Sequence, residues 1–102
     1  MRIIVVCGAG ASSTFVALRV RRAADARGLR VDARAAAESG LAEALRDADV
    51  LLVGAHLGDR VDALRELAAA ASVPIAVLPA GATASGGDAA LDLALDTVGG
   101  RS

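Results

Sequence analysis

The chain has 102 residues and a formal net charge of -1, and 55% of its residues are hydrophobic while 1% are aromatic. This length predicts one domain over residues 1–102 with one core and one site, without a separate substrate domain. Scattered charges and a lone aromatic residue, Phe15, give neither a basic stripe nor a stacking surface, so no nucleic acid is expected as a partner. No apolar run reaches the roughly 18 to 20 residues that cross a bilayer.

The predicted elements alternate between strand and helix along the chain. In order, they are a strand at 3–7, a helix from Thr14 to Arg27 closed by Gly28, a strand at 29–35, a helix from Leu41 to Asp47 led by Ser39, a strand at 50–54, a helix from Asp59 to Ala71, a strand at 73–78 and a helix from Asp88 to Val98 closed by Gly99. Three of the strands are continuous apolar runs, typical of parallel strands covered on both faces. The second strand instead alternates apolar and charged side chains, which predicts an edge strand.

Three of the predicted helices have one clearly apolar face. The residues that share such a face are Val16, Val20 and Ala23 in the first helix, Val61, Leu64 and Ala68 in the third, and Leu91, Leu95 and Val98 in the fourth. The whole pattern predicts an α/β fold, with a single open four-stranded parallel sheet in the order 2-1-3-4 and helices on both faces. In such a sheet the ligand crevice lies at the carboxyl ends of strands 1 and 3, where the connections diverge to opposite faces.

The only cysteine, Cys7, ends the first predicted strand. A single cysteine cannot form an internal disulfide, which fits a reducing compartment. Small residues, GAGASST at 8–14, separate it from the helix, and their backbone N–H groups and hydroxyls predict a nest for a phosphate. Because the positive end of a helix also stabilises a thiolate, we interpret Cys7 as a nucleophile beside a phosphate cradle rather than as an inert packing residue.

Cysteine phosphatases place an arginine six residues after the cysteine, where it grips the phosphoryl group. In this chain that position is Ser13, and no acidic residue of the later loops is an evident general acid for hydrolysis. Gly8 and Gly10 also begin a degenerate dinucleotide fingerprint, but the acidic residue expected at the end of the second strand is missing. A phosphoryl carrier is therefore favoured, and a small cysteine phosphatase and a nucleotide-binding regulatory module are the alternatives.

The stretch CGAGASSTFVALRV, residues 7–20, resembles the active-site segment of the IIB components of the bacterial phosphoenolpyruvate-dependent sugar phosphotransferase system, most of all the lactose, cellobiose and chitobiose group. The resemblance extends through the order of strands and helices to nearly the whole chain. It implies a fold similar to that of low-molecular-weight cysteine phosphatases, a cytoplasmic location and phosphotransferase activity without a cofactor. It also implies two partners, a IIA histidine phosphocarrier that charges Cys7 and a membrane IIC permease whose bound sugar receives the phosphoryl group, so that contact with the membrane is transient.

The resemblance assigns the catalytic role to Cys7. It assigns the phosphate cradle to Gly8, Ala9, Gly10, Ala11, Ser12, Ser13 and Thr14. His56, the only histidine, is either an exposed turn residue or an accessory group that donates a hydrogen bond to the phosphoryl group. The partners are expected to meet Cys7 over a small apolar surface formed by Ala9, Ala11, Phe15 and the loop from Pro79 to Asp88. One cysteine, one histidine and scattered acidic residues do not form a ligand set, so no metal is expected.

Overall fold

The strands and helices follow one another in the predicted order. The computed structural model describes residues 1–6, 10–54, 60–78 and 88–99. The strands in these ranges are β1 (Arg2–Val6), β2 (Asp32–Ala35), β3 (Val50–Val53) and β4 (Ile75–Val77). The helices are α1 (Gly10–Ala26), α2 (Leu41–Ala44), α3 (Val61–Ala70) and α4 (Asp88–Gly99), and the short 3-10 helices η1 (Glu38–Gly40) and η2 (Leu45–Asp47) flank α2.

The four strands form one parallel sheet in the order β2-β1-β3-β4, which confirms the predicted topology. Two of the apolar strands occupy its centre, where Ile3 is aligned with Val50 and Val6 with Val53. Every residue of β3 is buried, as expected for a central strand that is covered on both faces.

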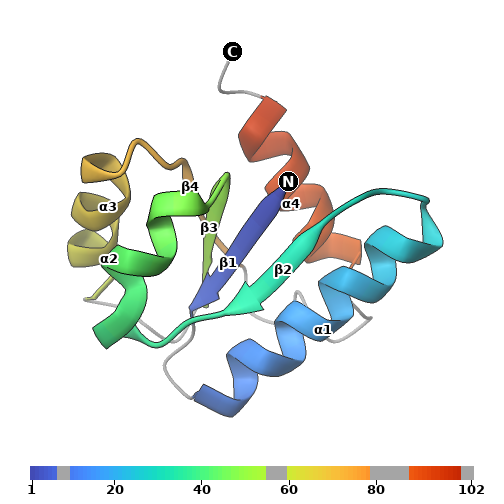
Figure 1. Ribbon diagram of the computed structural model, residues 1–102, viewed down its shortest axis with the longest axis horizontal. Coiled ribbons are helices and arrows are strands. Elements are labelled where there is room, and N and C mark those ends of the chain that lie inside the picture. Colours follow the sequence, from blue (N-terminus) through green and yellow to red (C-terminus); the bar gives the residue numbers. More distant parts are fainter. Residues whose placement is uncertain (7–9, 55–59, 79–87, 100–102) are drawn as a thin grey trace.

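Helices cover both faces of the sheet, with α1 and α4 on one face and α2 and α3 on the other (Figure 1). Successive side chains of a strand point to opposite faces of a sheet. Ile3 and Leu52 accordingly belong to the core that includes α1 and α4. Ile4 and Leu51 belong to the core that includes α2 and α3. The two central strands therefore hold together both apolar layers of the domain.

The helix faces predicted to be apolar do face these cores. The buried members are Val16, Val20 and Ala23 in α1, Leu64 and Ala68 in α3, and Leu91 in α4, while Val61, Leu95 and Val98 are half-buried against the same cores. The helical spacing of apolar residues thus predicted the packing side of each of these helices correctly.

Five elements begin at residues other than those predicted: β1, α3 and β4 differ by one or two residues, and α1 and β2 differ by three or more. Helix α1 begins at Gly10 and not at Thr14, so the small residues expected in a loop form its first turn. Alanine is the strongest helix former and serine is favourable at a helix start, which accounts for the longer helix. Strand β2 begins at Asp32 and not at Leu29, because its pairing starts opposite Arg2, the first residue of β1. The expected edge position of β2 is confirmed.

The end of α1 is tied to the beginning of α4. Arg27 donates one hydrogen bond from Nη1 to Oδ1 of Asp92 at 2.7 Å and another from Nη2 to Oδ1 of Asp88 at 3.0 Å. The bond from Arg27 also lowers the pKa of the Asp92 carboxyl. Exposed ion pairs of this kind contribute little stability individually. Their forked geometry nevertheless fixes where α4 begins relative to α1, two helices that are neighbours in Figure 1.

The turn after α1 requires a glycine. Gly28 has a φ of 70°, and its N–H donates to the carbonyl of Asp25 at 3.1 Å while the next N–H, of Leu29, donates to Ala24 at 2.8 Å. These are the two hydrogen bonds of a Schellman helix end. A Cβ at Gly28 would meet no atom within 4 Å, so the effect of a side chain there is confined to the backbone.

We therefore expect Gly28→Ala to lower the free energy of unfolding by about 1 to 2 kcal/mol, the cost of a left-handed backbone for an L-residue. Gly40→Ala is the matched control. Gly40 has a φ of -106° and equally open surroundings, so alanine should leave stability unchanged or raise it by a few tenths of a kcal/mol. Urea denaturation of both variants measures the difference, and equal effects at the two positions would contradict it.

Candidate functional site

The carboxyl ends of the strands meet at one edge of the sheet. The N–H of Gly54, which follows β3, donates to the carbonyl of Val6 at the end of β1 at 2.8 Å. The N–H of Leu78, which follows β4, donates to the carbonyl of Val53 at 2.7 Å. The chain therefore leaves the two central strands at neighbouring points, which confirms that the first and third strands end side by side. Cys7 is the next residue after Val6 in the sequence, and His56 is the second residue after Gly54.

The structure places the predicted site residues in two groups. Outside the described residues lie Cys7, Gly8, Ala9, His56 and the segment from Pro79 to Gly87. Within them, Gly10, Ala11, Ser12 and Ser13 form the first turn of α1, followed by Thr14, whose side chain is exposed. The expectation that residues 10–13 lie in a loop is thus wrong, whereas the role of the cysteine and of the cradle stays a prediction.

Helix α1 begins with no acidic residue in its first turn. The other three α-helices of the described ranges each have one there: Glu43 in α2, Asp62 in α3 and Asp88 in α4. A carboxylate at a helix start neutralises part of the positive end of the helix dipole and competes with a bound anion. The start of α1 therefore keeps its positive end, as a phosphate cradle requires.

The position of α1 on the sheet is held by packing and by one charged hydrogen bond. Val16 and Val20 are buried in the core that α1 shares with β1 and β3. Nε of Arg21 donates to the carbonyl of Ala33 on the edge strand β2 at 2.7 Å. These contacts hold the middle of α1 against the neighbouring strands.

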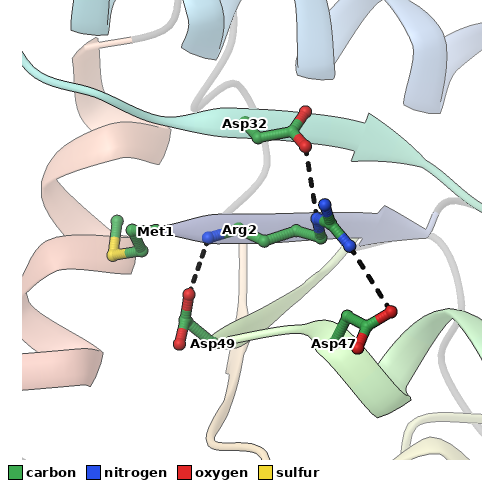
Figure 2. Close-up of a pocket in the computed structure, with 5 residues that line it drawn as sticks. All are labelled: Met1, Arg2, Asp32, Asp47 and Asp49. Carbon is green, nitrogen blue, oxygen red and sulfur yellow. Dashed lines mark hydrogen bonds and ion pairs between the residues drawn. The ribbon is translucent and has the colours of Figure 1, made fainter.

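The opposite edge of the sheet has a cluster of charges that the sequence analysis did not predict. A depression of about 440 Å³ is lined by Met1, Arg2, Asp32, Asp47 and Asp49. Figure 2 shows these five side chains. The lining residues lie at or before the first residues of the strands, and β1 alone spans roughly 13 Å from Arg2 to Val6. This depression is therefore separate from the edge at which Cys7 follows β1.

Arg2 is the centre of this cluster. Its backbone N–H donates to Oδ2 of Asp49 at 2.7 Å, and its guanidinium lies 3.2 Å from Oδ2 of Asp32 and 3.6 Å from Oδ2 of Asp47. No buried side-chain polar atom in the described ranges lacks a hydrogen-bond partner. The charges thus satisfy one another, and the cluster ties the first residues of neighbouring strands together.

Two arginines lower the pKa of the Asp32 carboxyl, Arg34 by the stronger hydrogen bond and Arg2 by a weaker one, and partial burial opposes them. A depressed carboxyl pKa contributes stability above the ordinary value of 3.8, and this contribution is lost as pH falls through the lowered pKa. We expect the urea midpoint to fall from pH 5 to pH 3, and Asp32→Asn to reduce that fall. Asp96→Asn removes an exposed carboxylate from α4 and should keep the wild-type pH profile; the same profile for both variants would exclude this role of Asp32.

A family model matched by sequence and solved structures matched by fold describe the same kind of protein. The family model for the "PTS system, Lactose/Cellobiose specific IIB subunit" matches residues 2–93. The structure of a cellobiose-specific phosphotransferase IIB component protein from Borrelia burgdorferi is 26% identical, with a TM-score of 0.75, and the match covers 100% of this chain and 94% of that one. No curated protein matched the chain significantly.

A second solved structure has the same fold at lower sequence identity. It is the lactose-specific IIB component domain of the phosphoenolpyruvate:carbohydrate phosphotransferase system from Streptococcus pneumoniae, 17% identical with a TM-score of 0.82, and the match covers 95% of this chain and 96% of that one. At this identity the likeness concerns the fold alone. In addition, none of the helices in the described ranges is long and apolar enough to span a membrane.

Proposed function

Because the chain belongs to the lactose/cellobiose-specific IIB subunit family of the phosphotransferase system, we propose that it is a cytoplasmic phosphocarrier whose acceptor is Cys7. A IIA component donates the phosphoryl group from a histidine, and a sugar bound by a membrane IIC permease receives it. Contact with the membrane is limited to the time that the permease is bound. The reaction class is phosphoryl transfer through a phosphocysteine.

Each transfer exchanges one bond to phosphorus for another. In the first step the sulfur of Cys7 attacks the phosphorus, the P–N bond to the donor histidine breaks, and the thiol proton passes to the leaving nitrogen. In the second step a sugar hydroxyl attacks, the S–P bond breaks, and the hydroxyl proton returns to the sulfur. A stabilised thiolate favours both steps, because the sulfur is the attacking group in the first step and the leaving group in the second.

The observation that carries this proposal is the hydrogen bond between Gly54 and Val6 at the carboxyl edge of the sheet. Cys7 follows Val6 directly, and α1 begins three residues later with no acidic residue in its first turn. Ligands of open parallel sheets bind at this edge, where connections leave for opposite faces. The arrangement suits a nucleophile next to a site for an anion.

We assign the cradle to Gly8, Ala9, Gly10, Ala11, Ser12, Ser13 and Thr14, whose backbone N–H groups and hydroxyls would hold the phosphoryl oxygens. His56 is the proposed accessory group. It stands two residues after Gly54, the residue bonded to the end of β1, so the chain has little length in which to separate it from Cys7. A histidine there would donate a hydrogen bond to the phosphoryl group or adjust transfer near neutral pH.

The alternative activity is hydrolysis by a small cysteine phosphatase, and the lifetime of the phosphoprotein separates the two. Ser13 stands where a phosphatase needs arginine, so the charge of the hydrolytic transition state is poorly stabilised. Donors that hold the ground state about as well as the transition state give little acceleration. The chain is first phosphorylated with phosphoenolpyruvate, the general components of the phosphotransferase system and a IIA protein, which are then removed. Mass spectrometry should show that the phosphoprotein persists in buffer and loses its phosphoryl group when permease and sugar are added. Loss of the label within seconds in buffer alone would favour the phosphatase.

A further inference from the structure

Backbone groups of the outer strand β2 point away from the rest of the sheet. Asp32 donates its N–H to the carbonyl of Met1 at 2.8 Å, and Ala36 donates to the carbonyl of Val5 at 2.9 Å. Because alternate residues of a strand in a parallel ladder bond to the same neighbour, Ala33 directs its N–H and C=O away from β1. β2 is the first strand in the order of the sheet, so these two groups lie at a sheet edge (Figure 1). We name residues Asp32–Ala35 the β2 edge.

A side chain of α1 covers the outward carbonyl of this edge. Nε of Arg21 donates to the C=O of Ala33 at 2.7 Å, a distance typical of a strong, charge-assisted hydrogen bond. Arg21 is exposed, whereas Ala33 is 0% exposed, so the guanidinium reaches the strand at the rim of the core. Charged side chains at sheet edges are a common means by which proteins prevent their strands from pairing between molecules.

The charges of the β2 edge are complementary to those of a second β2 edge. When two such strands pair antiparallel about Ala33, Asp32 of one copy lies directly opposite Arg34 of the other, and two-fold symmetry makes the reverse pair identical. Within one copy, Nε of Arg34 already lies 3.1 Å from Oδ2 of Asp32, so both side chains occupy the same face of the strand. Opposite charges in facing positions stabilise a strand pair. The charge pattern of this strand therefore favours self-pairing.

The carbonyl that Arg21 covers is the one that this pairing needs. With Ala33 at the centre, the two copies of Ala33 exchange both of their N–H···O bonds, as the hydrogen-bonded positions of an antiparallel ladder do. Nε of Arg21 already occupies that acceptor. A second strand would lie about 4.8 Å from β2, in the space that the guanidinium takes. Arg21 thus blocks the central hydrogen bonds of the pair.

We propose that the β2 edge is an association surface for a second copy of this chain, and that Arg21 keeps it closed so that the protein stays monomeric. Without the donor of Arg21, the chain forms a two-fold symmetric dimer in which two four-stranded sheets join through their β2 edges. The inference is independent of the phosphocarrier function, because it uses only backbone groups and charges at the outer strand of the sheet.

The test measures the dimer dissociation constant by sedimentation equilibrium over a series of protein concentrations. Arg21→Met places a methyl group where arginine has Nε, whereas Arg21→Gln keeps an N–H donor at that position of the side chain. Arg21→Met should lower the dissociation constant about ten-fold or more, and Arg21→Gln should stay close to the wild type. The matched control Arg22→Met removes the same charge from the next exposed position of α1 and should remain monomeric. Amide hydrogen exchange followed by NMR should show new protection of the Ala33 N–H in Arg21→Met alone.

A second substitution tests the geometry of the pair. In the Arg21→Met variant, Arg34→Asp places a carboxylate opposite Asp32 of the other copy and should weaken the dimer about five-fold or more. Arg46→Asp makes the same change of charge at an exposed position in η2 and should leave the dimer intact. Equal effects of these two substitutions would assign the association to another surface and overturn the inference.

Other results would also overturn it. One is an Arg21→Met variant that is as monomeric as the wild type, and another is a wild-type chain that already dimerises with a protected Ala33 N–H. Circular dichroism checks the fold of each variant, and Arg21→Ala is a second variant without the donor that keeps a strong helix former in α1 and should dimerise as well. Loss of the fold in both variants would show that Arg21 is needed to hold α1 on the sheet rather than to block pairing, which contradicts the proposed role.

Discussion

Cys7→Ala is expected to carry no phosphoryl label under conditions that charge the wild-type chain completely, and phosphorylation of sugar should fall by a factor on the order of 10³ or more. The physical reason is that no other thiol exists in the chain, so no residue can replace the sulfur as the acceptor. Intact-mass spectrometry after incubation with the donor system measures the first effect, and sugar phosphate formed with permease vesicles measures the second.

Cys7→Ser is the variant that separates nucleophilicity from packing. Because serine is similar in size, the variant should fold normally. Because its hydroxyl stays protonated at neutral pH, the variant should not transfer the phosphoryl group. In addition, the rate at which the wild-type thiol reacts with iodoacetamide should rise with pH around an inflection clearly below the free-thiol value of about 8.5. A label that persists in Cys7→Ala, or a thiol that does not react, would rule out the assignment of Cys7.

Leu52→Ala should lower the free energy of unfolding by about 3 kcal/mol, within the 2 to 5 kcal/mol typical of a buried leucine. Leu52 is 0% exposed in the central strand β3, aligned with Val5 on one side and with Ala76 on the other. The strands around the cavity that alanine would leave cannot close it without breaking the hydrogen bonds of the parallel sheet. Since a domain of this size has a total stability of roughly 5 to 15 kcal/mol, the loss is a large part of it.

Leu67→Ala is the control for this effect, because Leu67 is 37% exposed on α3 and its truncation should change stability by less than about 0.5 kcal/mol. Circular dichroism is the suitable measurement, since the chain has no tryptophan and no tyrosine for fluorescence. Equal destabilisation by the two truncations would show that β3 does not organise the core in the way described.

The topology was predictable because burial leaves a direct mark on the sequence. Strands β1 and β3 are covered on both faces, so they read as unbroken apolar runs, and the alternating run that contains β2 identified an edge. Apolar residues at helical spacing likewise predicted the inner side of α1, confirmed by the burial of Val16 and Val20. These features depend on local composition, which is visible without knowledge of distant contacts.

The remaining differences arise where distant contacts decide. Strand β2 starts at Asp32 because Arg2 is its first pairing partner, and the alternating pattern contains no information on where that partner begins. The charges around Arg2 were missed for the same reason, since Asp32, Asp47 and Asp49 meet only through the register of the sheet. The start of α1 was missed because serine and glycine are found in loops as well as at helix starts. The cysteine and its cradle were predicted from their place between strand and helix, and those assignments are the ones that the transfer experiments address.

The central position of β1 has a consequence for synthesis of the chain on the ribosome. Ile3 is aligned with Ala33 on one side and with Val50 on the other, so the inner partner of the first strand is made 47 positions later. At roughly 5 to 20 residues per second, the segment that leads to Cys7 waits about 2 to 10 s before both of its neighbouring strands have been synthesised. During that time the strongly apolar segment has no partner strand to cover it, so it is the part of the nascent chain most exposed to aggregation.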